Sequence, residues 1–565
     1  MKKIKLCLII ILSLAALLRF WRLDKFPPGL FGDEVDVGYQ AYSLLRTGRD
    51  IKGNFLPTYL DSLAEPRAPL LMYVTAPFLK VFGVNEWGVR IVPAFFGVLS
   101  VFLVFALVQA VFNDQALALT AAFLIAITPW HLTYSRAAFE VSLLLSLILS
   151  GTLFFLKALK KSIFWLPVSV ISFGLSFYTY NTANIFVPLW VITLMLFYRK
   201  DFAKTWLKFS RQIIFSFLLG LLMVFPLVNQ TLHGSAAFRF RLVSIFSDPK
   251  VIDTIVFKRS IAAPGSIPER IFHNKIVYWV KSFSSNYLES LSFKFLFVSG
   301  DPNPRQTIPG IGLLFMAFVF PLLLGIYQSI KERQKSGQLI VSWLIIAPIA
   351  SCFTTDGGNH ATRLILMLPP LIILVSVGIA FMRKTKLGRY FLVILAVCLF
   401  FELSFYLHEM TVHYPKEQFR YWHYGYKEAV SLYKENLGLC DKLYLNNTHE
   451  PFLIRYLFWT QTDPSWFREN FNGDEETQIV QNIFLSFKLG NSYFGRIVVP
   501  DSFQAIKNLL SDKRTCYLAF QGDEIPGDFD LRKNSQPGLR VLGVVEDLWG
   551  KPYIYLLHAD EKQEN

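Results

Sequence analysis

The sequence predicts an α-helical membrane protein with about eleven transmembrane helices, which ends in a small extracytoplasmic α/β domain. Three observations predict this fold class. The 565 residues are 53% hydrophobic and only 17% charged, whereas soluble proteins have about 45–50% apolar and about 25% charged residues. Apolar runs long enough to span a membrane recur up to residue 407, and the chain is polar and mildly acidic from residue 408 onward. The excess apolar surface requires lipid as a second solvent.

The same composition excludes several classes of protein. A disordered chain, a collagen-like chain and a small disulfide scaffold are incompatible with this apolar content and with only five cysteines. The net charge of +15 does not predict nucleic-acid binding, because basic residues are expected in the cytoplasmic loops of a membrane protein.

Eleven stretches approach the roughly 20 mostly apolar residues that a span needs. They cover residues 6–21, 88–112, 115–134, 138–157, 163–180, 184–198, 212–231, 308–328, 338–354, 363–381 and 389–407. The first stretch is followed by Arg19-Phe-Trp-Arg22 rather than a small-residue cleavage site. We therefore interpret it as a retained helix and not as a signal peptide.

The stretch from Pro69 to Gly83 decides the orientation. It is short, contains Pro77 and Lys80, and fits an interfacial helix better than a span. If it does not cross, the basic loops between later spans lie on the same side as the basic N-terminus, as the positive-inside rule prefers. The N-terminus is then cytoplasmic in a plasma (inner) membrane. The segments 24–87, 232–307 and 354–363, together with the tail, then face outward.

The chain divides into a membrane part, residues 1–407, and a tail, residues 408–565. The tail has strand-like runs at 442–445, 496–499, 516–520, 539–545 and 553–557, with helical patterns at 426–437 and 502–510. Cys440 and Cys516 both lie in it. They can pair if the tail faces an oxidising compartment, but the sequence does not show that they are close.

The first outer segment contains adjacent carboxylates, Asp33 and Glu34, followed by Asp36 at the start of a helical run. Acids at a helix start can simply complement the helix dipole. Because this pair follows the first span directly, it also suits general-base catalysis at the membrane surface.

A second polar pair, Arg136 and Glu140, lies at the outer ends of two apolar stretches. The two residues share a helix face if one helix runs through both, so a salt bridge is one interpretation. Ionisable groups at membrane depth are costly, and they are functional candidates for that reason. Arginine can also hold a phosphate with two hydrogen bonds.

Three more outer segments carry polar residues of interest. The turn 354–363 contains His360 and Arg363 beside two glycines, which suits an anion or a plain loop. Gly300-Asp301 and Arg305 precede a span, and Glu65-Pro-Arg67 precedes the short helix at Pro69.

No metal site is indicated, although a dependence on a divalent metal stays open. The outer histidines, which are His131, His233, His273 and His360, lack the spacing of ligand motifs. The chain also has no Walker loop and no glycine-rich dinucleotide motif. No cofactor is predicted, and an activated donor used on the outer face can be linked to a lipid.

These features together resemble the polytopic glycosyltransferases of family 39 and GT-C type, which include protein O-mannosyltransferases and the lipid A aminoarabinose transferase. The resemblance covers residues 1–200 best. It rests on a basic N-terminus, one span, an outer loop with Asp33-Glu34, an interfacial helix ending in Phe82-Gly83, and Arg90 opening the next span. Asp301, Arg305, His360 and Arg363 resemble bacterial members more loosely.

The resemblance implies a site, a partner and a reaction. It implies Asp33 as general base with Glu34 beside it, and Glu140 as a second acid. Phosphate contacts are expected from Arg136, Arg67, His360 and Arg363, and substrate contacts from Glu65, Tyr178, Tyr180, Asp301 and Arg305. Tyr178 and Tyr180 also fit an interfacial aromatic belt. The order Glu65-Pro-Arg67 departs from the Glu-Lys-Pro-Pro of the aminoarabinose-transferase-like members.

The implied reaction moves a sugar, such as mannose, from a polyprenyl phosphate to a protein, lipid or glycan acceptor on the outer face. One displacement would invert the anomeric centre. The alternative is a transporter or lipid flippase, which would favour ionisable residues near the midplane and an internal repeat.

Overall fold

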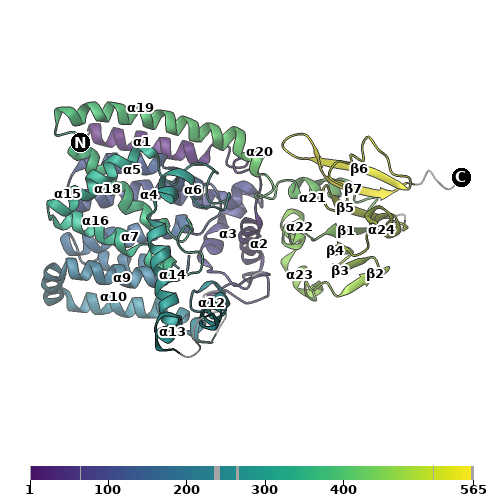
Figure 1. The fold of residues 1–565 in the computed structure, drawn as a ribbon, viewed down its shortest axis with the longest axis horizontal. Coiled ribbons are helices and arrows are strands. Elements are labelled where there is room, and N and C mark those ends of the chain that lie inside the picture. Colours follow the sequence, from purple (N-terminus) through teal and green to yellow (C-terminus); the bar gives the residue numbers. More distant parts are fainter. Residues whose placement is uncertain are drawn as a thin grey trace.

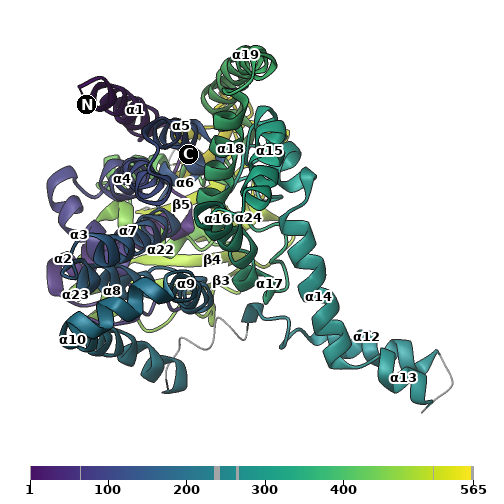
Figure 2. The ribbon, with the colours of Figure 1, turned by 90° about the vertical axis from the view of Figure 1, so that its left-hand side faces the viewer.

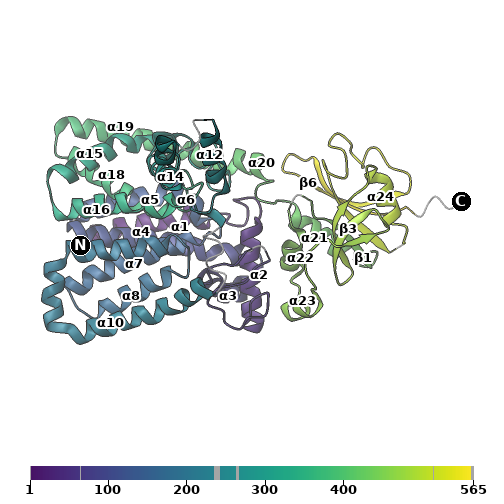
Figure 3. The same cartoon turned by 60° about the horizontal axis from the view of Figure 1, so that its bottom comes forward.

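The computed structural model describes residues 2–63, 65–233, 242–261, 266–448, 450–512 and 514–560. A large helical bundle carries a smaller sheet-containing part at one end (Figure 1). Helices α2 (Gly32–Thr47) and α3 (Leu70–Phe82) lie at the end of the bundle that faces the sheet (Figure 3). This junction positions the candidate site.

A helix or a helix pair overlaps each of the eleven predicted stretches. In chain order these are α1 (Lys2–Phe20), α4 (Glu86–Phe112), α5 (Gln115–Ile127) with α6 (Pro129–Ser135), α7 (Val141–Lys160), α8 (Trp165–Ser176), α9 (Ala183–Phe197), α10 (Arg199–His233), α15 (Val319–Lys331), α16 (Lys335–Ile346) with α17 (Ile349–Cys352), α18 (Leu368–Met382) and α19 (Lys386–His408).

Six helices in the described residues are long and apolar enough to cross a membrane, or up to seven if a bent pair counts as one span. The bent pair is α5 and α6, which meet at 60° because Thr128 is extended before Pro129. Four further apolar helices, including α8 and α9, have 10–17 residues. The chain is therefore a multi-pass membrane protein, and the count of eleven spans stays a prediction.

The two helices expected in the first outer segment are present. Helix α2 begins after an extended Phe31 and ends at Gly48, whose φ of 68° is the left-handed conformation that glycine adopts most easily. Helix α3 has 13 residues with Pro77 inside it, so it is too short to span a membrane unaided.

The outer segment 232–307 has more structure than its sequence pattern suggested. It contains α12 (Pro249–Ser260), α13 (Ile267–Phe272), α14 (Lys275–Ser290) and the π-helix η1 (Lys294–Ser299). These helices form an arm that projects from the bundle (Figure 2). Phe257, Ile271 and Ile276 of the arm are exposed.

Within the bundle, the short helices η2 (Met316–Phe318) and η3 (Ile365–Met367) lead into α15 and α18. Other short helices join the bundle to the sheet and flank the sheet. They are η4 (Glu409–His413), α20 (Tyr414–Gln418), α21 (Tyr426–Glu435), α22 (Phe452–Thr460), α23 (Pro464–Asn470) and α24 (Ser502–Leu509). Two of them, α21 and α24, coincide with the helical patterns predicted in the tail.

The tail folds around one seven-stranded sheet with the order β2-β3-β4-β1-β5-β7-β6. The strands are β1 (Lys442–Asn446), β2 (Gln478–Val480), β3 (Phe484–Leu489), β4 (Ser492–Ile497), β5 (Thr515–Phe520), β6 (Leu539–Glu546) and β7 (Pro552–Ala559). Strand β1 is parallel to β4 and β5. The sequence predicted five of these strands and missed β2 and β3, which continue from β4 as antiparallel partners.

The sheet part and the first outer segment share one hydrophobic core. Val35 and Leu71 of α2 and α3 belong to the same buried cluster as Phe458 and Leu518. Across the junction, the Tyr39 hydroxyl donates to the Thr462 carbonyl at 3.0 Å. The tail is therefore packed on the loop that carries Asp33.

A disulfide joins Cys440 to Cys516, with Cα atoms 5.3 Å apart. It closes a loop of 76 residues, and cross-links that close long loops stabilise chiefly by restricting the unfolded chain. We expect the double variant Cys440→Ser/Cys516→Ser to lose about 2–5 kcal/mol of unfolding free energy, measured by denaturation of the full chain in detergent. The exposed, unpaired Cys398 supplies the control Cys398→Ser, and equal stability of both variants would refute the expectation.

Candidate active site at the start of helix α2

Three carboxylates surround one arginine at the start of α2. The Arg67 guanidinium donates to Asp33 Oδ1 at 2.6 Å, lies 2.9 Å from Asp36 Oδ2, and lies 3.7 Å from Glu140 Oε1. We call these four residues the Arg67 cluster. The Arg67 side chain is 7% exposed and the Asp33 side chain 54%, so the cation is enclosed while one carboxylate stays open to solvent.

Local structure explains how the cluster forms. Asp33 and Asp36 are three residues apart on α2, so both face the same way. Arg67 is held by a pair of backbone hydrogen bonds with Leu60 at 2.8 and 2.9 Å. Glu140 immediately precedes α7. The sequence predicted roles for Arg67, Asp33 and Glu140, but Asp36 was given none.

Burial and charge oppose each other in the cluster. Burial raises the pKa of Asp36, and the nearby Arg67 cation counteracts that shift. Burial disfavours the charged form of Arg67, but Asp33, Asp36 and Glu140 outweigh it and raise the pKa of Arg67. Glu65 also acts on Asp36, raising its pKa. Arg67 is thus the cation that offsets part of the burial of Asp36, and the surrounding acids in turn favour the charged form of Arg67.

Glu34 does not join the cluster. Its carboxylate accepts from Arg90 Nε and Nη2 at 2.8 and 2.7 Å and from the Ala138 backbone amide at 2.9 Å. Both side chains are fully buried. Because adjacent residues of a helix point in different directions, Glu34 faces the core when Asp33 faces solvent. The predicted catalytic role does not fit this position, and Glu34 instead fixes α2 to α4.

Arg136 also lies apart, which corrects the expected pairing with Glu140. Helix α6 ends at Ser135 and α7 begins at Val141, so no single helix carries both residues. The Arg136 guanidinium instead donates to backbone carbonyls at the end of α1, including that of Leu18 at 2.7 Å. It is 2% exposed and acts as a C-terminal cap of α1, which does not fit the predicted phosphate contact.

A second polar cluster forms where two outer segments meet. Asp301 accepts hydrogen bonds from the backbone amides of Ala361 and Asn303 at 2.6 and 2.8 Å, and burial raises its pKa to about 6. Arg363 is paired with Asp356 and donates to Thr354 Oγ1 at 2.6 Å.

Both Arg363 and His360 lower the pKa of Asp356 against the effect of its burial. Asp356 is more than half exposed, so a phosphate can replace it as the partner of Arg363.

Aromatic side chains connect the two clusters. Phe31, two residues before Asp33, lies 5.4 Å from the Phe139 ring and 5.2 Å from the Arg305 guanidinium. The Tyr134 ring lies 4.8 Å from Phe139, and its hydroxyl bonds Thr362 Oγ1 at 2.8 Å. The predicted residues of the first and third outer segments therefore converge on one region.

The two tyrosines predicted as substrate contacts lie in the turn between α8 and α9. The Tyr178 hydroxyl donates to the Met223 carbonyl at 2.6 Å. The Tyr178 carbonyl accepts from Leu70, three residues after Arg67, at 3.0 Å. Tyr180 packs against the hydrophobic core of the bundle. Tyr178 thus links α8 to the start of α3.

The Arg67 cluster opens into a cavity of about 370 Å³ that the tail closes. Asp33, Asp36, Ser62 and Arg67 line one side. The tail contributes Asn447, Glu450, Pro451, Leu453, Ile454, Arg455, Asp474 and Phe487. The sequence gave no signal for these tail residues, because only the folded sheet brings them to the first outer segment.

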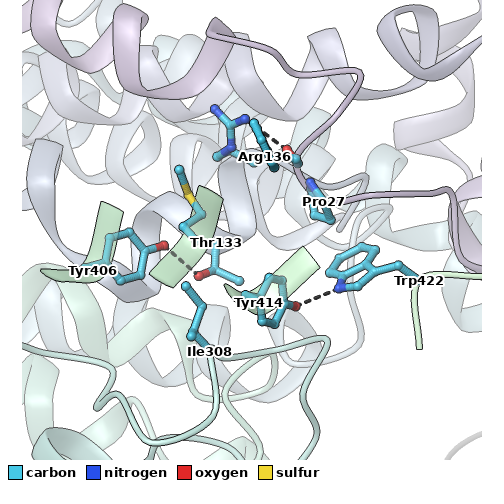
Figure 4. Close-up of a pocket in the computed structure, with 9 residues that line it drawn as sticks. Pro27, Thr133, Arg136, Ile308, Tyr406, Tyr414 and Trp422 are labelled. Atoms are coloured by element: carbon cyan, nitrogen blue, oxygen red, sulfur yellow. Dashed lines mark hydrogen bonds between the residues drawn. The ribbon is translucent and has the colours of Figure 1, made fainter. Parts of the chain in front are cut away.

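A smaller pocket beside Arg136 is shown in Figure 4, with Thr133 bonded to Tyr406 at 3.2 Å and Trp422 to Tyr414 at 2.6 Å. Its volume is about 20 Å³, which is room for about one water molecule. It is a packing defect at the junction and too small for a substrate. In the described part of the chain, no group of three or more His, Cys, Asp or Glu residues is arranged to hold a metal ion.

Comparison with known proteins relates part of the chain to one family. Residues 66–228 match the family model of dolichyl-phosphate-mannose-protein mannosyltransferases. The resemblance to polytopic glycosyltransferases is thereby confirmed. The matched segment includes Arg67, Arg90, Arg136 and Glu140.

Individual relatives are more distant. YycA of Bacillus subtilis (strain 168), provisionally named a mannosyltransferase, is 33% identical over 125 residues, which is 22% of this chain and 18% of YycA. ArnT of Cupriavidus metallidurans bound to undecaprenyl phosphate is 12% identical, with a TM-score of 0.49 over 97% of each chain.

The oligosaccharyltransferase AglB of Archaeoglobus fulgidus, in complex with an inhibitory peptide and a dolichol-phosphate, is 16% identical. The match has a TM-score of 0.44 over 77% of this chain and 58% of AglB.

Removing the central cation should change the pH dependence of activity. In Arg67→Gln the acids lose the charge that favours their ionised form, so their pKa values rise. We expect the acidic limb of the pH–rate profile to move to higher pH, with lower activity at neutral pH. The control is Arg468→Gln, which replaces an arginine that donates to Ser43 and to the Asp50 carbonyl outside the cluster. A profile identical to wild type would show that Arg67 does not tune the acids.

Proposed function

We propose that the protein is a membrane glycosyltransferase that moves a sugar from a polyprenyl-phosphate donor to an acceptor on the extracytoplasmic face. The observation that carries this proposal is the Arg67 cluster, which holds one open carboxylate at the mouth of a cavity. The family match over residues 66–228 supports the class of reaction. Mannose is the sugar that this family name favours.

Asp33 is the proposed base. Its Oδ1 is oriented by Arg67, and its exposure lets an acceptor hydroxyl approach. The acceptor oxygen attacks the anomeric carbon as Asp33 removes its proton, the bond from that carbon to the phosphate oxygen breaks, and polyprenyl phosphate leaves with the electron pair. This single displacement inverts the anomeric centre. A positioned base contributes about 10²–10⁴-fold to the rate.

Glu140 and Asp36 position Arg67 and hence the base. Arg363 and His360 are the proposed contacts of the donor phosphate, since an exposed Asp356 can yield to it. Cations aimed at a departing phosphate stabilise the charge that develops there. This chemistry calls on no bound cofactor, and the acceptor is a protein, lipid or glycan.

The charge distribution supports a cytoplasmic N-terminus. The turns that join α9 to α10 and α15 to α16 lie at the end of the bundle opposite the sheet (Figure 1). There Lys335, at the start of α16, pairs with Asp201 of α10 at 3.4 Å, and Lys160, at the end of α7, donates to the Ala110 carbonyl at 2.9 Å. The basic N-terminus lies at the same end (Figure 1). In keeping with the positive-inside rule, we propose that this end is cytoplasmic and that the Arg67 cluster and the tail lie on the outer side of the plasma membrane.

The test uses the purified full chain with radiolabelled polyprenyl-phosphate sugars and a crude membrane fraction as acceptor. We expect label to leave the lipid fraction for one donor and to appear in acceptor material. A donor panel that includes mannose, glucose and aminoarabinose identifies the sugar. Retention of every label on the lipid, with acceptors from the same source present, would contradict the proposal.

A further inference from the structure

A second cavity lies beside the active-site cavity, on the other side of Glu450. Its volume is about 500 Å³. Arg305 is its lining residue from the bundle; the others belong to the linker and the tail, and they are Arg420, Tyr421, His423, Tyr426, Glu450, Phe520, Gln521 and Tyr553. Because Glu450 lines both cavities, a ligand held in the second one is a near neighbour of the Asp33 site.

The two arginines of this cavity form no close ion pair among the described residues, although Arg305 lies near enough to Glu450 to act on its charge. The Arg305 guanidinium lies over the Phe31 ring at 5.2 Å, and its buried Nε has no hydrogen-bond partner. The Arg420 guanidinium lies 5.9 Å from the Tyr553 ring. In the described part of the chain, neither guanidinium has a carboxylate at ion-pair distance.

Glu450, the carboxylate that lines the cavity, contacts two other side chains. Glu450 lies 3.2 Å from His423 Nε2 and 3.2 Å from Arg455 Nη2. The hydrogen bond from His423 and the nearby charges of Arg455 and Arg305 outweigh burial and lower the pKa of Glu450 to about 2. Arg305 and Arg420 therefore give the cavity a net positive charge, and planar guanidinium groups bind phosphate and carboxylate with paired hydrogen bonds.

The topology of the sheet is a second observation that favours ligand binding at this cavity. Strands β1 and β5 are parallel neighbours. Phe520 ends β5, and the loop after β1 brings Glu450 to the cavity. Ligands of open α/β sheets bind outside the carboxyl ends of parallel strands. The tail thus presents its ligand-binding edge to the membrane part.

We propose that this cavity, formed by Arg305, Arg420 and the carboxyl edge of the tail sheet, binds an anionic saccharide that is the acceptor of the reaction. The assignment as acceptor rests on the proposed function. Partly exposed rings of Tyr421 and Tyr553 offer flat apolar faces for a sugar ring, as in other pockets that combine aromatic walls with a few polar groups. A lipid-anchored donor places its phosphate near the span ends, whereas this cavity is walled mainly by the tail.

The test measures binding without turnover. The full chain in detergent is titrated with mannose 6-phosphate, mannose and inorganic phosphate, and binding is followed by ligand-observed NMR. We expect mannose 6-phosphate to bind at least about tenfold more tightly than mannose, because the phosphate adds charge-assisted hydrogen bonds that the neutral sugar lacks. Equal binding of the neutral sugar would overturn the proposal.

Variants assign the binding to this cavity. Arg305→Gln and Arg420→Gln should each weaken mannose 6-phosphate and phosphate by about tenfold, and Tyr421→Ala should weaken the sugar phosphate alone. Arg540→Gln, at an exposed arginine of β6 outside the cavity, is the matched control. Unchanged binding in Arg305→Gln/Arg420→Gln would overturn the proposal.

A competition experiment distinguishes an acceptor site from a donor site. Farnesyl phosphate carries the phosphate of a donor without its sugar, and we expect it to leave mannose 6-phosphate in place. Displacement of mannose 6-phosphate by farnesyl phosphate would overturn the assignment as an acceptor site and indicate that the cavity binds the donor. If the binding pattern holds but no sugar transfer is found with any donor, the proposed function fails while the anionic-saccharide site stands.

Discussion

Asp33→Asn should reduce sugar transfer by about 10²–10⁴-fold and leave the fold intact. The amide keeps the shape of the side chain and can still contact Arg67, but it cannot accept the proton of the acceptor hydroxyl. Stability is expected to change little, because Asp33 is more than half exposed and its contact with Arg67 is one of three that this cation makes.

The measurement compares initial rates of label transfer for wild type and variant at saturating donor. Asp528→Asn, at an exposed aspartate in a loop of the tail, is the matched control and should retain full activity. Thermal unfolding and gel filtration of the same preparations report folding. Wild-type rates in Asp33→Asn would remove Asp33 from the chemistry and point to Glu140.

Arg90→Met should cause the largest loss of stability. Arg90 pairs with Glu34 through two hydrogen bonds and also donates to the carbonyls of Leu23 and Pro27 at 3.2 and 2.8 Å. Removing one partner of a buried ion pair leaves an uncompensated charge and costs about 3–5 kcal/mol. We expect this loss in the unfolding free energy of the full chain in detergent.

A double-mutant cycle separates the pair from the rest of the environment. Glu34→Leu/Arg90→Met removes both charges and should recover part of the lost stability. The control residue is Arg532, whose side chain is 36% exposed and pairs with Asp530 and Glu546, and Arg532→Met should cost at most about 1 kcal/mol. If Arg90→Met is no more harmful than Arg532→Met, the buried pair does not hold α2 against α4.

The positions of most helices could be predicted, because runs of apolar residues are visible in the sequence without any knowledge of which distant residues are in contact. Each of the eleven apolar stretches overlaps a helix or helix pair, and α2 and α3 form where the first outer segment predicted them. Strands β2 and β3 escaped prediction because they pair within a local antiparallel unit whose sequence mixes polar and apolar residues. The helices of the 232–307 segment were missed for the related reason that their exposed apolar residues obscure a periodic pattern.

The site was predicted in part. Spacing alone could not show that the chain breaks between Arg136 and Glu140, which sends the two side chains to different partners. Nor could it show that Glu34 turns into the core while Asp36 joins Asp33, since that choice depends on how α2 packs on α4. The contribution of Glu450 and Arg455 depends on the tail folding over the first outer segment, a contact between residues some 400 positions apart in the sequence.

The most direct test of the central claim follows donor and product in one sample. The full chain is reconstituted into liposomes with a polyprenyl-phosphate sugar labelled in both the sugar and the lipid, together with the acceptor fraction that supports transfer. The account predicts that free polyprenyl phosphate and glycosylated acceptor appear in equal amounts and at equal rates, and that Asp33→Asn abolishes both. Movement of the intact, doubly labelled donor across the bilayer without cleavage would contradict the account and identify a flippase.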